Sequence, residues 1–399
     1  MANVSSSNGL EKRPKLRFPG FDEPWKETAL SSVLTERNEY AEKDGTYEHA
    51  TLSKEGIYGK TARYDRDFLV STENKKYKVT HLGDLCYNPA NLKFGVICLN
   101  TYGDAIFSPI YVTFEIEASF DPDFIGAYLT RWDFINRALK YQQGTVYERM
   151  AVSPEDFVSI KCCFPQKAEQ TRLAEFITLL DKRIAAQGKY VESLKKYKRG
   201  LLSQLIAQKK AFDTSGEWKT VKLGHIFKER TERAKGNETL LAVTISNGVQ
   251  RRDEIDLKDN SSDDKSNYKC VYIGDIAYNT MRMWQGASGV SPYNGIVSPA
   301  YTIVTPIRPD LHNMTFWAYY FKYSPLVQTF QKYSQGLTSD TWNLKFPQFS
   351  EIAVTMPPIS EQDKIAECLS VFDEHCKCED EKLQALLQVR TSLLQQLFI

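Results

Sequence analysis

The stretch FPQKAEQTRLAEFITLLD, residues 164–181, occurs a second time in closely similar form, as MPPISEQDKIAECLSVFD at residues 356–373. Both segments contain a proline, then Glu-Gln, and then apolar residues at helical spacing, which is typical of a helix start. Aligning Gln170 with Gln362 gives an offset of 192 residues, about half of the 399-residue chain. This spacing indicates that the chain is an internal repeat.

Further matching segments lie before and after this helix start. The offsets between them range only from 190 to 193 residues, so the two copies differ by short insertions. The matched segments are Trp25-Lys26 with Trp218-Lys219, Gly56 with Gly248, YKVTHLGDLCYN (77–88) with YKCVYIGDIAYN (268–279), Ser108-Pro109 with Ser298-Pro299, YQQG (141–144) with YSQG (333–336), and LLSQL (201–205) with LLQQL (393–397).

Each copy ends in a long predicted helix whose apolar residues recur in steps of three and four, as in a coiled-coil seam. The predicted seam residues are Leu173, Ile177, Leu180, Ile184, Val191, Leu194 and Leu201, and Ile365, Leu369, Phe372, Leu383, Leu386, Leu393 and Leu397. Two such helices most simply pack on each other about a two-fold axis, and therefore antiparallel. About 33 residues at a rise of 1.5 Å would hold the copies on the order of 50 Å apart.

The rest of each copy has short β-branched and aromatic runs between Gly, Pro, Asn and Asp, which predicts strands. GDAIFSPIYVTFEI (103–116) indicates a strand pair or a bent strand, and aromatic spacing indicates helices at about 124–141 and 314–333. The predicted fold class is α+β (mixed α/β), with two similar globular domains joined by two long antiparallel coiled-coil helices and a pseudo-two-fold repeat. The expected segments are a disordered tail (1–15), domain 1 (16–163), spacer helix 1 (164–212), domain 2 (213–355) and spacer helix 2 (356–399).

The composition excludes several classes of protein. Apolar residues make up 42% and charged residues 25%, as in soluble globular proteins, and no apolar run could span a bilayer. The polar start resembles no signal peptide and the eight cysteines form no C-x-x-C pair, so we expect a cytoplasmic protein with reduced thiols. The five histidines lack metal-ligand spacing, and we predict no metal site.

The net charge of +1 hides a strongly basic segment. Residues 182–210 contain nine Lys or Arg and one acidic residue, Glu192. These basic residues could bind DNA phosphates, bind acidic patches on a partner subunit, or simply be solvated on the surface of a charged helix. We favour the first two.

Two linked, similar domains could recognise duplex DNA. The duplex has two-fold axes perpendicular to its length, and proteins with two-fold symmetry bind half-sites at a fixed separation along it. The framing motifs repeat closely, whereas NPANLKFGVICLNTYGDA (88–105) differs from NTMRMWQGASGVSPYNGI (279–296). Equal frames with unlike inserts suggest an asymmetric, bipartite DNA target.

Three motifs occur twice in the same order: Y-x-x-x-x-x-G-D-[IL]-x-Y-N, then Ser-Pro, then P-x-x-x-E-Q-x-x-[IL]-A-E at the start of a long helix. This arrangement resembles the specificity subunit of type I restriction–modification systems, from about Leu16 to Leu397. The resemblance implies two target-recognition domains, each reading half of a split double-stranded DNA site. It also implies that two adenine-N6 methyltransferase (modification) subunits, which use S-adenosylmethionine, dock on the chain, and that restriction translocase subunits join them. The chain itself would catalyse nothing and bind no cofactor.

Candidate DNA contacts are Arg, Lys, Asn, Gln and Thr residues in loops, because Arg and Gln read base edges and Lys suits phosphates. They are Arg37, Lys54, Lys60, Arg63, Lys93, Gln142, Gln143 and Arg149 in the first copy, and Arg230, Arg233, Asn247, Arg251, Arg252, Arg282, Gln335 and Thr338 in the second. Surface solvation is the alternative role for each of them.

Two other functions stay open: a self-sufficient DNA-modifying enzyme, and a coiled-coil interaction scaffold without a nucleic-acid role. The first is disfavoured because no two glycines lie two residues apart, as the usual methyltransferase loop needs. NPAN (88–91) also lacks the second proline and the aromatic residue of the amino-methyltransferase motif.

Overall fold

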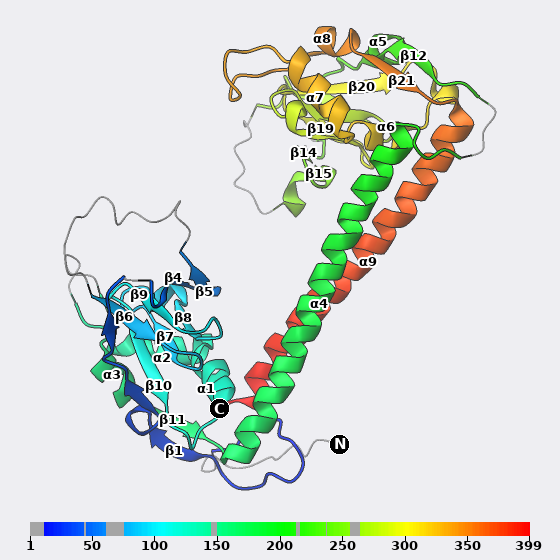
Figure 1. The fold of residues 1–399 in the computed structure, drawn as a ribbon. Coiled ribbons are helices and arrows are strands. Elements are labelled where there is room, and N and C mark those ends of the chain that lie inside the picture. Colours follow the sequence, from blue (N-terminus) through cyan, green and yellow to red (C-terminus); the bar gives the residue numbers. More distant parts are fainter. Residues whose placement is uncertain are drawn as a thin grey trace. The chain divides into compact units, whose positions relative to one another are not determined.

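A computed structural model describes residues 12–43, 45–60, 76–144, 150–212, 216–236, 238–255 and 264–399. The chain divides into two compact units (Figure 1): unit 1 comprises residues 1–187 and 383–399, and unit 2 comprises residues 188–382. Each unit therefore contains one globular domain and parts of both long helices. Most of the expected tail, residues 1–11, lies outside the described residues.

The long helices are α4 (Lys167–Ile206) and α9 (Ile359–Leu397), and they pair antiparallel in each unit. In unit 1, Asp181 near the start of α4 accepts two hydrogen bonds from Arg390 near the end of α9. In unit 2, Lys195 of α4 pairs with Asp380 of α9, and Lys198 of α4 pairs with Asp373 of α9. Residue numbers therefore rise along one helix as they fall along the other. The predicted fold class is confirmed.

Burial along the two helices follows the predicted seam. All of the predicted seam residues are buried or half-buried. At the helix ends the seam joins the domain cores: Leu173, Ile177 and Leu397 belong to the core of unit 1, and Ile365 and Leu369 to that of unit 2. The helices are thus anchored in the domains by apolar burial.

The described residues of unit 1 form three sheets. Their strand orders are β2 (Leu34–Glu36), β10 (Val112–Ile116), β7 (Leu85–Tyr87), β8 (Ile97–Leu99) in the first; β3 (Tyr40–Ala41), β6 (Tyr77–Thr80), β9 (Ala105–Phe107), β4 (Glu48–Ser53), β5 (Gly56–Gly59) in the second; and β1 (Lys26–Ala29), β11 (Lys161–Phe164) in the third. All pairs are antiparallel except β4 with β9.

Unit 2 repeats the four-stranded sheet and the two-stranded sheet beside the helices. Its strand orders are β13 (Phe227–Glu229), β20 (Tyr301–Pro306), β17 (Ile276–Asn279), β18 (Ser288–Val290), then β12 (Lys219–Lys222) with β21 (Ala353–Met356). The pairs β14 (Leu241–Thr244) with β15 (Gly248–Arg251) and β16 (Lys269–Val271) with β19 (Gly295–Val297) complete it.

Residues 103–116 form neither the expected strand pair nor one bent strand, but two strands in different sheets. β9 pairs with β6 and β4, whereas β10 pairs with β7 and β2 in a different sheet. The Ser108 carbonyl accepts a bond from the Tyr111 amide at 3.1 Å, so the Ser-Pro segment is a turn that carries the chain from one sheet to the other. Adjacent strands in the sequence therefore have their partners elsewhere.

Each helix expected after the strands is broken into two. Residues 124–141 fall in α1 (Pro122–Leu129), α2 (Trp132–Ala138) and a 3-10 turn, and residues 314–333 in α6 (Met314–Tyr320) and α7 (Ser324–Tyr333). Asp121 and Asn313 cap α1 and α6 by accepting a backbone bond at 3.0 Å. The second helix of each pair begins after a residue with extended backbone, Arg131 or Tyr323. The spacing of apolar residues in the sequence does not reveal this break.

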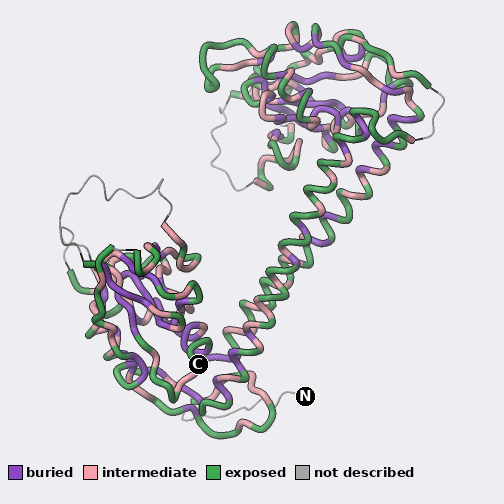
Figure 2. Tube along the Cα trace, in the orientation of Figure 1, coloured by how far each residue is buried: buried purple, intermediate pink, exposed green. Residues whose placement is uncertain are grey.

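Short helices close the domain cores. They are α3 (Pro154–Ser159), α5 (Leu223–Ile226) and α8 (Phe346–Ser350). Buried residues gather in the sheets and under these helices within each unit (Figure 2). Tyr87 stacks on Phe157 at 4.7 Å in unit 1, and Tyr278 stacks on Phe349 at 5.2 Å in unit 2, so the Tyr of the repeated Tyr-Asn pair is a core residue in both.

The glutamine of the repeated Glu-Gln motif joins each long helix to its domain. Gln170 is 2% exposed, donates to the carbonyl of the motif's proline at 2.9 Å and accepts from the Asp121 amide at 3.0 Å. Gln362 is fully buried and makes the same two bonds, both at 3.0 Å, with the second from the Asn313 amide. In each unit, this glutamine therefore ties the start of the long helix to the N-cap residue of α1 or α6.

Among the described residues, no helix is long and apolar enough to cross a membrane.

Candidate nucleic-acid interface

The Gly-Asp pair of the repeated frame forms a buried turn that holds one predicted DNA-contact arginine in each unit. Asp84 is 2% exposed and accepts from Arg37 Nε at 2.9 Å and Nη2 at 3.0 Å. Asp275 is 3% exposed and accepts from Arg230 Nε at 2.7 Å and Nη2 at 3.0 Å. These hydrogen bonds raise the pKa of both arginines against the effect of burial. The two guanidinium groups are therefore part of the frame, each with two of its five N–H donors bound to the aspartate.

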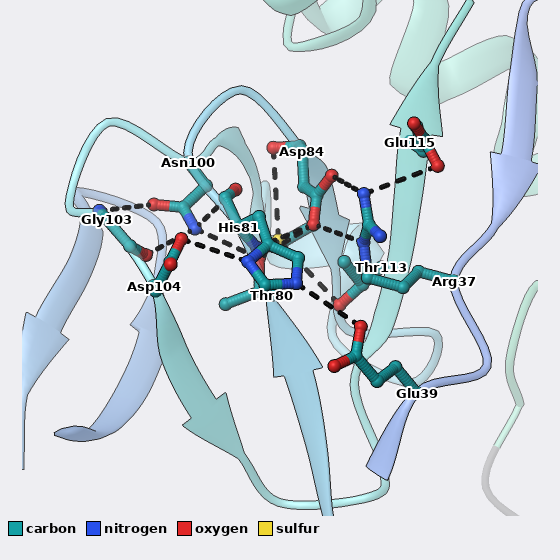
Figure 3. Close-up of polar contacts among 11 residues, drawn as sticks. Arg37, Glu39, Thr80, His81, Asp84, Asn100, Gly103, Asp104, Thr113 and Glu115 are labelled. Atoms are coloured by element: carbon teal, nitrogen blue, oxygen red, sulfur yellow. Dashed lines mark hydrogen bonds and ion pairs between the residues drawn. The ribbon is translucent and has the colours of Figure 1, made fainter. Parts of the chain in front are cut away.

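Unit 1 has a polar cluster beside this turn (Figure 3). His81 Nδ1 lies 3.0 Å from Asp104 Oδ1, and Nε2 lies 3.3 Å from Glu39 Oε2. Burial lowers the pKa of His81, but hydrogen bonds with these two carboxylates outweigh it and raise the pKa above its usual value. Asn100 donates to Thr80 Oγ1 at 3.0 Å and to two backbone carbonyls. The cluster holds the loops around residues 81 and 100 together.

Unit 2 fills the same position with different chemistry. Tyr272 stands where unit 1 has His81, and the Arg230 guanidinium lies 4.7 Å from its ring centre. Ser291 stands where unit 1 has Asn100, and its hydroxyl donates to the Tyr293 carbonyl at 2.7 Å. The backbone turn is the same in both units while its surroundings differ.

A 3-10 turn follows the Tyr-Asn pair in each unit: η3 (Leu92–Phe94) and η6 (Met283–Gln285). Asn88 and Asn279 open these turns by accepting backbone bonds two residues ahead, at 3.1 and 3.0 Å. A glycine with φ of 77° or 81° closes each turn. Asn88, the asparagine of NPAN, is 5% exposed and organises this turn.

The exposed side chains on these turns differ between the units. Unit 1 presents Lys93, which lies 5.2 Å from the ring centre of Phe94, itself 61% exposed. Unit 2 presents Arg282 and Met281, which is 43% exposed. Among the described residues, no side chain pairs with the Arg282 guanidinium, whereas the four other predicted contact arginines of unit 2 are ion-paired or hydrogen-bonded.

Two further loops of unit 2 adjoin the η6 turn. The loop from Gln335 to Asn343 is closed by mutual backbone bonds of 3.0 and 2.8 Å. It is joined to the η6 segment because Trp342 packs on Trp284, with ring centres 5.2 Å apart. Leu337 near its tip is fully exposed.

Lys322 connects the β14–β15 turn to η6. Its Nζ donates to the Ile245 carbonyl at 3.0 Å and to the Gly286 carbonyl. Burial, with a smaller contribution from Lys198, lowers the pKa of Lys322 to about 8. Residues 244–248, 280–286 and 335–344 are therefore one contiguous surface, which we call the unit 2 loop surface.

Unit 1 has the equivalent contact between its loops. Gln143 and Ala151 exchange two backbone bonds of 2.9 Å, and the Val152 amide donates to the Pro89 carbonyl at 3.3 Å. Gln142 and Gln143 use their side-chain amides on the Met150 carbonyl and on Asp156, both at 2.9 Å. These two glutamines stabilise the loop, and reading a base would require breaking these bonds.

The predicted contact residues have three different placements. Arg63 and Arg149 lie outside the described residues. Arg37, Lys60, Gln142, Arg230 and Arg252 are half-buried. The exposed residues are Lys54, Lys93, Gln143, Arg233, Asn247, Arg251, Arg282, Gln335 and Thr338. The unit 2 loop surface brings together Asn247, Arg282, Gln335 and Thr338.

Several exposed cations are already paired. Lys54 lies 3.4 Å from Glu55, Arg251 lies 3.1 Å from Asp253, and Arg233 donates to the Asn267 carbonyl. Exposed pairs of this kind are weak, worth about 0–1 kcal/mol, so a phosphate could replace the partner. On the basic helix α4, Lys195 and Lys198 pair with α9.

The residues of this region that the sequence prediction missed are Asp84, Asp275, Gln170 and Gln362. Each is buried and ties separate segments together. Their signal was present, because all four belong to the motifs that occur twice. Polar residues that repeat in both copies therefore indicate the shared frame.

Residues 215–388 match the family model of the type I restriction modification DNA specificity domain. The second half of the chain thus contains a domain of the class that gives type I systems their DNA sequence specificity. A comparison with curated protein sequences yields no match.

Solved structures resemble the chain over nearly its full length. The S subunit of a type I restriction-modification system from M. genitalium has a TM-score of 0.57 at 16% identity, covering 97% of this chain and 99% of that one. A structure described for complex assembly and conformational transition of the type I R-M system has a TM-score of 0.57 at 16% identity, covering 95% and 98%. The HsdS subunit from Thermoanaerobacter tengcongensis has a TM-score of 0.48 at 17% identity, covering 96% and 98%.

The first two structures establish a shared fold. Residues 215–388, which match the type I restriction modification DNA specificity domain, lie within this shared fold.

Proposed function

We propose that this chain is a non-catalytic DNA-specificity subunit that reads an asymmetric, bipartite duplex site, one half with each globular domain. The observation that carries this proposal is the equal frame with unlike loops. Both units build the same Arg–Asp turn and the same 3-10 turn, yet one presents Lys93 and Phe94 and the other Arg282 and Met281. Different exposed side chains on one scaffold would give the two domains different contacts with base edges and phosphates.

The paired helices would set the gap between the half-sites and carry two adenine-N6 methyltransferase subunits. Exposed large apolar residues at equivalent positions of the helices support such docking: Leu179 is 65% exposed and Val371 60% exposed. Each partner would supply S-adenosylmethionine and flip its target adenine into its own pocket. Restriction translocase subunits would join this assembly in the cytoplasm.

The test is selection from a pool of randomised duplexes, with the chain alone and with its methyltransferase subunits. The proposal predicts enrichment of two defined sequence elements at a fixed gap, and methylation only when the partner subunits are present. Methyl transfer by the chain alone would show a self-sufficient enzyme. A pool without any enriched split motif, even with partners present, would leave a protein-interaction scaffold.

A further inference from the structure

Unit 1 contains an open pocket between the start of α2 and the end of α9. Its volume is about 370 Å³, and Ala127, Arg131, Trp132, Arg390, Thr391 and Leu394 line most of it. Trp132 is 56% exposed, which is unusual for a residue of this size and makes it an accessible aromatic wall. Nothing in the DNA-reading role described above uses this pocket.

The equivalent place in unit 2 is filled by one side chain of the protein itself. Tyr319 stands at the position of Ala127, with the offset of 192 residues that relates α1 to α6. Its hydroxyl donates to Asp373 Oδ2 at 2.6 Å and lies 3.3 Å from Ser370 Oγ. Lys198 Nζ lies 4.7 Å from the centre of the Tyr319 ring, a cation–π contact.

Unit 1 keeps the ion pair beside this tyrosine but lacks the ring. Arg390 and Asp181 form an ion pair across the two helices, as Lys198 and Asp373 do in unit 2, and both residues are related by the same offset. Ala127 provides only a methyl group where unit 2 has a phenol. Of this ion pair, Arg390 lines the pocket, and it stands at the position of Lys198, which contacts the Tyr319 ring in unit 2.

Two further features of unit 1 favour an aromatic ligand. Arg131, which lines the pocket, lies over the Tyr128 and Phe398 rings, at 4.9 and 4.6 Å, so the pocket adjoins an existing cluster of aromatic rings and a cation. A cavity of about 150 Å³ already accepts benzene, so a pocket of this size has room for a phenol ring.

We propose that this pocket binds an aromatic side chain, a tyrosine, that a modification subunit inserts between α2 and α9. The inference rests on the proposed function for the identity of the partner, but not for the chemistry of the pocket. Aromatic residues in pockets are the usual anchors of protein interfaces. Because unit 2 fills the equivalent place with Tyr319, the two docking positions for the modification subunits are not equivalent.

The pocket is tested first with p-cresol, the side-chain analogue of tyrosine, on the full chain by ligand-observed NMR. We expect one binding site for p-cresol with a Kd on the order of 1 mM, because a ligand of about eight non-hydrogen atoms gains only a small binding free energy. Ala127→Tyr should abolish it by filling the pocket, and Tyr319→Ala should create a second site. Asp123→Tyr adds a tyrosine on the exposed side of the same helix and should leave binding unchanged. Should Ala127→Tyr unfold the chain, Trp132→Ala, which removes a wall, must weaken p-cresol binding.

The partner role is tested by titrating the modification subunit against the same variants. Ala127→Tyr should weaken the binding of one of the two modification subunits by about tenfold or more, equivalent to about 1.4 kcal/mol. Asp123→Tyr should weaken the binding of neither subunit. Unchanged p-cresol binding in Ala127→Tyr, or tighter binding of AMP than of p-cresol at this site, would overturn the pocket assignment. If Ala127→Tyr abolishes p-cresol binding but leaves the binding of both modification subunits unchanged, the proposal that a partner tyrosine enters the pocket is wrong. If the wild-type chain binds no modification subunit, the proposed function fails, and p-cresol still decides what the pocket accepts.

Discussion

The two units build the same turn and surround it with different side chains. Asp84 and Asp275 each hold an arginine through two hydrogen bonds. Beside that turn, unit 1 has a histidine between two carboxylates, and unit 2 has a tyrosine under the arginine. The difference separates the residues that define the fold from those that are free to vary, and only the latter can distinguish two DNA half-sites.

A second difference concerns the buried glutamate of the Glu-Gln motif. Glu169 is 1% exposed and binds Arg17 with two bonds of 2.7 Å. Glu361 is 3% exposed and accepts from Trp218 Nε1 at 2.9 Å. One copy therefore anchors its helix with an ion pair, and the other with a neutral donor.

The largest effect is expected at the turn that the copies share. Asp84→Ala and Asp275→Ala each remove the acceptor of two charged hydrogen bonds and of a backbone amide, and should destabilise their own unit by about 3 kcal/mol. Hydrogen exchange measured along the chain should show the loss in unit 1 for the first variant and in unit 2 for the second. Equal loss in both units would mean that the copies do not fold as separate compact units.

The glutamate pair should respond unequally to the same substitution. Glu169→Gln leaves the Arg17 charge without its counter-ion and should cost about 2–3 kcal/mol. Glu361→Gln keeps a carbonyl for the Trp218 N–H and should cost less than about 1 kcal/mol. Denaturant unfolding of the two variants measures both values. Similar losses would show that the charge of the Arg17 pair contributes little.

The exposed cations of the two 3-10 turns should act on separate half-sites. Arg282→Ala should weaken DNA binding by about 1–3 kcal/mol and relax the sequence preference of one half-site, as expected for a base contact. Lys93→Ala should lower affinity without changing preference and reduce the salt dependence, as expected for a phosphate contact. Binding titrations over a series of salt concentrations distinguish the two, each variant serving as the control for the other. A relaxed preference in both halves would contradict the assignment of one half-site to each domain.

The smallest effect concerns pH. The pKa of His81 is raised in the folded chain, so its stabilising contribution is complete below the unfolded value of about 6.5 and is lost as the pH rises through the folded value. The exposed carboxylate partners limit this contribution to less than about 1 kcal/mol. His81→Tyr, which installs the residue of the second copy, should remove this loss of stability between pH 6 and 8. A wild-type slope retained in the variant would assign it to other groups.

The sequence predicted the features that repeat at short range. The helix starts and the seam could be predicted because a heptad pattern present twice specifies two helices in one register. It did not predict the broken helices, since the extended residues Arg131 and Tyr323 do not interrupt the apolar pattern. The strand partners of β9 and β10 are also non-local, so alternation alone could not assign them.

The candidate site was less predictable than the fold. Arg37 and Arg230 have the residue type expected of DNA contacts, but their partners Asp84 and Asp275 lie 47 and 45 residues away. Only the fold brings each pair together. Equivalence between the copies was the available signal, because residues that read different half-sites should differ, and these four do not.

The central claim is that each domain reads its own half of the DNA site. The most direct measurement replaces residues 16–163 with those of another family member, keeps the rest of the chain, and sequences the methylated sites in a host that carries the modification subunits. The account predicts a new sequence in one half of the motif, with the other half and the gap unchanged. A change in both halves, or in neither, would contradict it.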